Sequence, residues 1–148
     1  MRPNQTGPPK SDNLTLAFLI RAVCAGNADL LEAAMANLTG TPRARVGGII
    51  AEGREAAFRA LYGRSGLSDD ALPVFTTAIA VWRDEARHAA ADQETDGTRL
   101  NRKVMRRIMS LVGEERLTNG AILALLDRLE AEYEREAAYK FSTQLKLA

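Results

Sequence analysis

The sequence has very little of the residue types that most often build disulfides, metal sites and catalytic centres. Its 148 residues include one cysteine, Cys24, and one histidine, His88. A single cysteine excludes an internal disulfide framework and a cysteine-rich zinc site, and one histidine is too few for a histidine-based metal site. No phosphate-binding glycine loop, dinucleotide fingerprint or other catalytic pattern occurs. The sequence therefore predicts no catalytic residue, no metal, no cofactor and no small-molecule substrate, and a protein that is not an enzyme.

Long apolar runs and an excess of one charge are also missing. The longest uncharged stretch, residues 71–82, is shorter than the roughly 20 residues that a membrane-spanning helix needs. Lys and Arg number 20 against 19 for Asp and Glu, and this net charge of +1 argues against a strongly polyanionic partner for the whole molecule. The first residues lack the apolar core of a secretory signal. We expect a soluble, cytoplasmic protein.

The composition that remains is typical of helices. The chain has 25 Ala and 18 Leu, both strong helix formers, whereas aromatic residues make up only 5%. This composition predicts an all-α fold. Residues 1–12 carry three prolines and no large apolar side chain apart from Met1, so they are expected to form a disordered tail ahead of a single α-helical domain over 13–148.

Capping residues, glycines and apolar spacing divide residues 13–148 into about seven helices. The expected starts are the N-caps Thr15, Asn27, Thr41, Ser68, Thr98 and Thr118, and Arg54 for the fourth helix. Glycines at 26, 40, 53, 63 and 113 are expected to end five of these helices. The helices fall into paired hairpins over 13–66, a long central helix plus a basic helix over 67–112 with a loop at 92–97, and a C-terminal helix and extension over 113–148. The central helix has the longest apolar stripe and is expected at the centre of the core.

The first two hairpins show a weak internal repeat. A shift of 26 residues superposes Thr15–Gly40 on Thr41–Gly66 with four identities. This match favours two stacked, HEAT-like helical hairpins followed by a helical bundle. The alternative is that any two helix pairs that end in glycine align this well.

The sharpest feature is a basic stripe on the sixth predicted helix. Five cations lie within nine residues at helical spacing, and no acidic residue interrupts them: Arg99, Arg102, Lys103, Arg106 and Arg107. Such a stripe is a candidate anion-binding face for phosphate groups of nucleic acid or of an anionic membrane. It is equally explained as a solvated face, or as a partner of the acidic residues Asp127–Glu136 of the final helix. No aromatic residue interleaves with the stripe, so base stacking has no support.

Two further segments are candidate interaction faces. Gly47 and Gly48 lie within a predicted helix and, together with Ala44 and Ala51, form a flat face that another helix could approach closely; a bend or break of the helix explains them equally well. The C-terminal extension carries Tyr139, Phe141 and Leu145 beyond the main apolar face of the last helix, where it either frays or docks on a partner.

Neither His88 nor Cys24 lies in a pattern that indicates chemistry. His88 falls on the flank of an apolar stripe; histidine phosphotransfer is conceivable there, but an ordinary surface histidine explains it better. Cys24 follows Val23 and lies four residues after Ile20 on an apolar helix face. It has no neighbouring cation to lower the pKa of its thiol, so we expect it to be a small core residue.

Four segments resemble a bacterial family, the C-terminal part of domain of unknown function 2336: Leu14–Gly40, Phe58–Leu67, Phe75–Trp82 and, more loosely, Leu123–Glu132. The resemblance implies an α-helical protein from alphaproteobacteria. Members of this family often have repeat-like helical hairpins ahead of this region. No such array precedes residue 14 here, which is expected of a short stand-alone version or an excised domain. The resemblance implies no activity and no catalytic residues.

Together these features favour a non-enzymatic regulatory or scaffolding module that binds a protein partner or a second copy of itself. The first alternative is binding of nucleic acid or an anionic membrane through residues 99–107, and the second is phosphotransfer-like signalling through His88.

Overall fold

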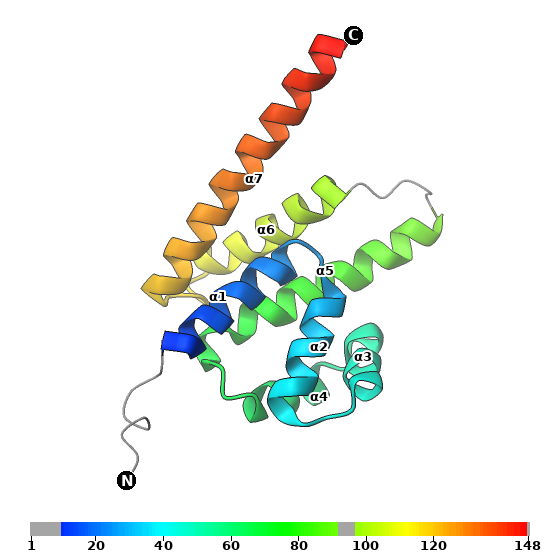
Figure 1. Cartoon of the computed structure of the whole chain (residues 1–148), viewed down its shortest axis with the longest axis vertical. Coiled ribbons are helices and arrows are strands. Elements are labelled where there is room, and N and C mark those ends of the chain that lie inside the picture. The colour runs from blue at the N-terminus through cyan, green and yellow to red at the C-terminus, as the bar shows by residue number, and fades with distance from the viewer. Residues whose placement is uncertain (1–9, 92–96, 148) are drawn as a thin grey trace.

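A computed structural model describes residues 10–91 and 97–147, and over these residues the chain is all-α (Figure 1). The elements in chain order are α1 (Lys10–Cys24), α2 (Ala28–Thr39), α3 (Arg43–Glu52), α4 (Glu55–Arg64), the 3-10 turn η2 (Asp69–Ala71), α5 (Leu72–Ala91), α6 (Gly97–Gly113) and α7 (Gly120–Leu147). The predicted fold class and the number of helices are confirmed. Within the same described residues, no helix has both the length and the apolar content needed to cross a membrane.

The first helix starts earlier than predicted. Of the expected tail, residues 1–9 lie outside the described part of the chain, but Lys10–Asp12 already belong to α1. Thr15 is therefore an internal residue of α1 and not its N-cap. After Pro9 the sequence has no glycine or proline until Gly26, so nothing in it prevents the helix from forming this early.

The predicted helix ends are partly confirmed. Asn27 caps α2, its Oδ1 accepting a hydrogen bond from the Leu30 backbone N–H at 3.2 Å, and Gly40 closes α2 in the left-handed conformation, with φ 71°. Thr41 does not cap α3; its hydroxyl lies 2.8 Å from that of Thr39, and Pro42 takes the cap position.

Two other boundaries also differ from the prediction. Gly63 does not end α4, which continues to Arg64 because burial of Leu61 and Tyr62 outweighs the cost of one glycine in a helix. Of the expected loop at 92–97, residues 92–96 lie outside the described part, and Gly97 is the first residue of α6.

The central helix is where the sequence predicts it. α5 packs against α1, α3, α4 and α6, and in Figure 1 it runs through the middle of the molecule. Its Phe75 is fully buried, with its ring centroid 5.3 Å from that of the buried Tyr62 of α4. The Tyr62 hydroxyl donates to the Ser68 backbone oxygen at 2.7 Å, so the polar end of this buried ring is satisfied.

The arrangement of the first four helices as HEAT-like stacked hairpins is not confirmed. α2 packs against α3 and α4, but α1 packs against α5, α6 and α7 as well as α2. The first helix therefore helps to form the bundle that α7 completes. Three side chains of α7 enter the common core of this bundle: Ile122, Leu126 and Leu129.

Candidate interaction surfaces

The predicted basic stripe lies on the outer face of α6. On the inner face Val104, Met105 and Ile108 are buried, while Arg102, Arg106 and Arg107 are exposed. Arg99 also lies in α6, but its side chain is outside the described part of the structure. We call the described residues Arg102, Lys103, Arg106 and Arg107 the basic ridge.

One cation of the basic ridge forms an ion pair within the chain. Its partner lies on α5, whereas the sequence suggested acidic residues of the final helix as partners. Lys103 Nζ forms an ion pair with Glu85 of α5, not with an acid of α7. Among the described residues no ion pair forms at the guanidinium groups of Arg102, Arg106 or Arg107. Neutralisation of the ridge is therefore partial and comes from the α5 side.

A groove separates the basic ridge from α7, because the two helices diverge towards the C-terminal end of α7 (Figure 1). The groove has a volume of about 540 Å³. Arg102 and Arg106 line one wall, Glu130 and Glu134 the other, and Met105, Met109 and Tyr133 supply apolar surface between them. We call this space the α6/α7 groove.

Tyr133 contributes a buried polar atom beside this groove. Its hydroxyl is buried and has no hydrogen-bond partner among the described residues, and burial raises the pKa of Tyr133 to about 12. The phenol is therefore neutral at pH 7 and cannot serve as a base there. Sequence reasoning did not single out Tyr133 as a groove residue, because its place in the groove depends on how α6 and α7 diverge.

Cys24 is a core residue, as predicted. Its side chain is fully buried, and burial raises the pKa of the thiol to about 12, so the nucleophilic thiolate is negligible at neutral pH. Among the described residues no cluster of three or more His, Cys, Asp and Glu side chains could hold a metal ion.

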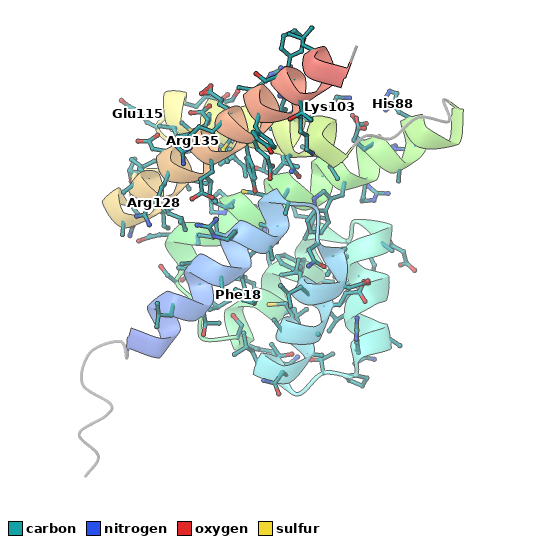
Figure 2. The ribbon with its side chains drawn as sticks, turned by 45° about the horizontal axis from the view of Figure 1, so that its top comes forward. Phe18, His88, Lys103, Glu115, Arg128 and Arg135 are labelled. Atoms are coloured by element: carbon teal, nitrogen blue, oxygen red, sulfur yellow. The ribbon has the colours of Figure 1, made fainter. Side chains whose placement is uncertain are left out.

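His88 lies on the exposed surface towards the end of α5 (Figure 2). Its Nδ1 lies 2.7 Å from the backbone oxygen of Asp84, one helical turn earlier. This contact holds the ring along its own helix and leaves Nε2 as the outer nitrogen. The contact is also the one expected of an ordinary surface histidine, so phosphotransfer at His88 stays a prediction.

The small-residue face of α3 is not a single free surface. Ala44 and Ala51 are exposed, and a Cβ added at Gly48 would meet no atom within 4 Å. A Cβ at Gly47, however, would lie 3.1 Å from a carboxylate oxygen of Glu32, so this glycine faces α2 of the same chain. α3 is also continuous through both glycines, which corrects the alternative that the helix breaks there.

The C-terminal part of α7 projects beyond the other helices (Figure 1). We call residues 137–147 the α7 extension. Tyr139, Phe141 and Leu145 are exposed there to 73%, 62% and 61%. They do not form one face: Phe141 and Leu145 share a side of the helix with Ala137, whereas Tyr139 lies about 200° away from Phe141.

An ion pair that is not evident from the sequence links the N-terminal half of α7 to α1. Arg21 of α1 donates to Glu132 at 2.7 Å, and this hydrogen bond is the main reason why the pKa of Glu132 is lowered.

Sequence reasoning also missed two exposed apolar residues on α1, Leu14 and Phe18. They lie one helical turn apart, and Phe18 is marked in Figure 2. Both lie at least about 100° around α1 from the buried residues Leu19 and Ile20, so helical spacing is the signal that could have found them.

Comparison with models of protein families identifies a family for most of the chain. Residues 9–110 match the model of a family described as an uncharacterised protein conserved in bacteria, DUF2336. The looser resemblance noted at residues 123–132 lies outside the matched segment. No curated protein and no solved structure matches the chain. Because the match covers more than half of the sequence, this chain belongs to the DUF2336 family.

Proposed function

We propose that this chain is a non-enzymatic regulatory or scaffolding module that binds another polypeptide through the α7 extension. One observation carries the proposal: Phe141 and Leu145 lie on one side of a projecting helix with more than half of each side chain exposed. Apolar side chains in such a position gain stability when a partner covers them. The helix also presents this surface away from the bundle, where a partner meets little obstruction.

Site-specific photo-crosslinking tests this proposal directly. A photoreactive residue at position 141 or 145 is expected to give crosslinks to polypeptide, whereas the same residue at exposed Thr143, about 200° around the helix from Phe141, is expected to give few. Equal crosslinking at positions 141 and 143, or none at either, would contradict the proposal. The polypeptide identified by crosslinking should co-purify with the full chain and not with a chain truncated after Ala138. The truncated chain should keep its fold, because the buried residues described in α7, Ile122, Leu126 and Leu129, precede the cut.

The basic ridge supports a second candidate function, binding of phosphate groups carried by nucleic acid or membrane lipid. The supporting observation is that three of its four side chains form no ion pair with the described residues. Such binding should weaken steeply with salt, because each neutralised phosphate releases counterions.

Charge reversal at the basic ridge tests this second candidate. We expect Arg102→Glu with Arg106→Glu to abolish binding to duplex DNA or to anionic vesicles, and the two ligands distinguish the source of the phosphate. The control is Arg45→Glu with Arg128→Glu, which changes the net charge equally at two exposed arginines outside the ridge. Equal losses in both double variants would indicate a non-specific charge effect and would rule out the ridge as a site.

A further inference from the structure

We propose that the partner of the α7 extension is a second copy of this chain, whose own α7 crosses it in an antiparallel direction. This inference rests on the proposed function and names the partner for the same surface. It depends on three properties of residues 133–145: the spacing of their apolar side chains, the sizes of those side chains, and the order of their charges.

The spacing favours a crossed pair of helices. Tyr133, Ala137, Phe141 and Leu145 follow each other at intervals of four residues, which turns the row by about 40° at each step. A row of this kind is an i±4 ridge. Two such ridges interlock when their helices cross at about −50°, the commonest class of helix packing. The contact is therefore short and centred between Ala137 and Phe141.

Side-chain size selects the antiparallel direction. When two copies cross at this centre in antiparallel orientation, Ala137 of each chain faces Phe141 of the other, so a large side chain meets a small one twice. A parallel pair would set Phe141 against Phe141 and Ala137 against Ala137, leaving a gap beside a crowded contact. Ala137 is half-buried and Phe141 is 62% exposed in the single chain, so Phe141 is the residue whose apolar surface would be buried by a partner.

Charge order favours the same direction. Residues 127–136, which precede the centre, hold five acidic and two basic side chains, whereas the basic Lys140 follows the centre. In the antiparallel pair Glu136 of each copy lies on the same side as Lys140 of the other, within about one helical turn. A parallel pair would place the acidic segments against each other, which is unfavourable.

The α6/α7 groove extends this contact. In the antiparallel register Leu145 of the second copy reaches the level of Tyr133, which lines the groove together with Met105 and Met109. These side chains offer an adaptable apolar surface to the incoming leucine. Both exposed apolar residues on this side of the extension therefore find cover in one arrangement, Phe141 on Ala137 and Leu145 at the groove.

Molar mass in solution tests the inference on the full chain. Light scattering and sedimentation equilibrium from a few to several hundred micromolar should show a shift from one chain to two. The contact is smaller than the roughly 1,600 Å² of a standard interface, so modest affinity is expected. We expect Phe141→Glu to raise the dimer dissociation constant at least about tenfold, because the contact would bury an unpaired carboxylate. Thr143→Glu introduces the same charge on the opposite side and should leave the constant nearly unchanged.

Charge reversal tests the direction of the pair. Glu136→Lys and Lys140→Glu should each weaken the dimer, and the double variant should restore it. A mass of one chain over the whole concentration range, or a dimer that persists unchanged in Phe141→Glu, would overturn the inference. Circular dichroism verifies that each variant stays helical, as expected for exposed positions.

The two proposals fail in different ways. A monomeric chain whose position 141 crosslinks to a different polypeptide overturns self-association and leaves the proposed function standing. A monomeric chain with no crosslinks at that position overturns both.

Discussion

At the scale of single residues, glycines with similar sequence contexts have opposite roles. Gly53 ends α3 with φ 64°, and a Cβ there would clash with the side chain of Arg83, which reaches across from α5 and donates to the Ala51 backbone oxygen. Gly48, only five residues earlier, is helical and has open space around its Cα. The first glycine is therefore required by the fold, and the second is not.

Alanine substitution should separate these two glycines. Gly53→Ala is expected to lower the free energy of unfolding by about 1–2 kcal/mol, because it combines an unfavourable φ with displacement of Arg83. Gly48→Ala should raise it by about 0.5–1 kcal/mol, since alanine is the better helix former. Urea denaturation of both variants measures these differences. Destabilisation by Gly48→Ala would contradict this expectation and would indicate that another helix packs closely against α3 at Gly48.

At the scale of helices, the sequence predicted where helices exist better than where they end. Asn27 accepts a backbone hydrogen bond at the helix start predicted for it, whereas Ser68 caps the 3-10 turn η2 and α5 begins only at Leu72. The last helix starts one residue later than predicted: Asn119 and not Thr118 is its cap, and its Oδ1 accepts from the backbone N–H groups of Ala121 and Ile122 at 3.0 and 3.1 Å. Both residue types are good N-caps, so local sequence does not choose between them.

The tertiary structure makes that choice, and substitution can verify it. Asn119 Nδ2 also donates to Asp70 at 3.0 Å and so ties the start of α7 to η2. Asn119→Ala should lower the free energy of unfolding by about 1 kcal/mol through loss of the cap. Thr118→Ala should change it by much less, because Thr118 is exposed and makes no cap hydrogen bond among the described residues. Equal effects in the two variants would contradict the assignment.

At the scale of the whole molecule, the near-neutral net charge conceals how the charges are distributed. Residues 99–107 hold five basic side chains, and neighbouring segments are acidic. The sequence showed this segregation but not which groups meet. Lys103 pairs with α5, and Arg21 pairs with a residue 111 positions away. Such pairs depend on how helices are placed in space, and no periodicity in the sequence encodes that placement.

The Arg21–Glu132 pair gives the fold a predictable pH dependence. The pKa of Glu132 is lowered in the folded chain, so its contribution to stability is present above the ordinary glutamate pKa of about 4.3 and is lost as the pH falls through the folded value. Glu132→Gln should therefore lower the Tm at pH 7 and have less effect at pH 3. Glu134→Gln, on the same helix and without an ion pair among the described residues, is the control and should show no such difference.

The span of the family match has a consequence for which fragment of the chain can fold. The match stops at residue 110, inside α6, whereas the core of this molecule also includes Leu117, Ile122, Leu126 and Leu129. The matched segment is thus smaller than the folding unit. A fragment that ends at residue 110 would leave the apolar faces of α1 and α6 without the cover that α7 gives them. Such a fragment is expected to aggregate unless another polypeptide supplies the missing helix.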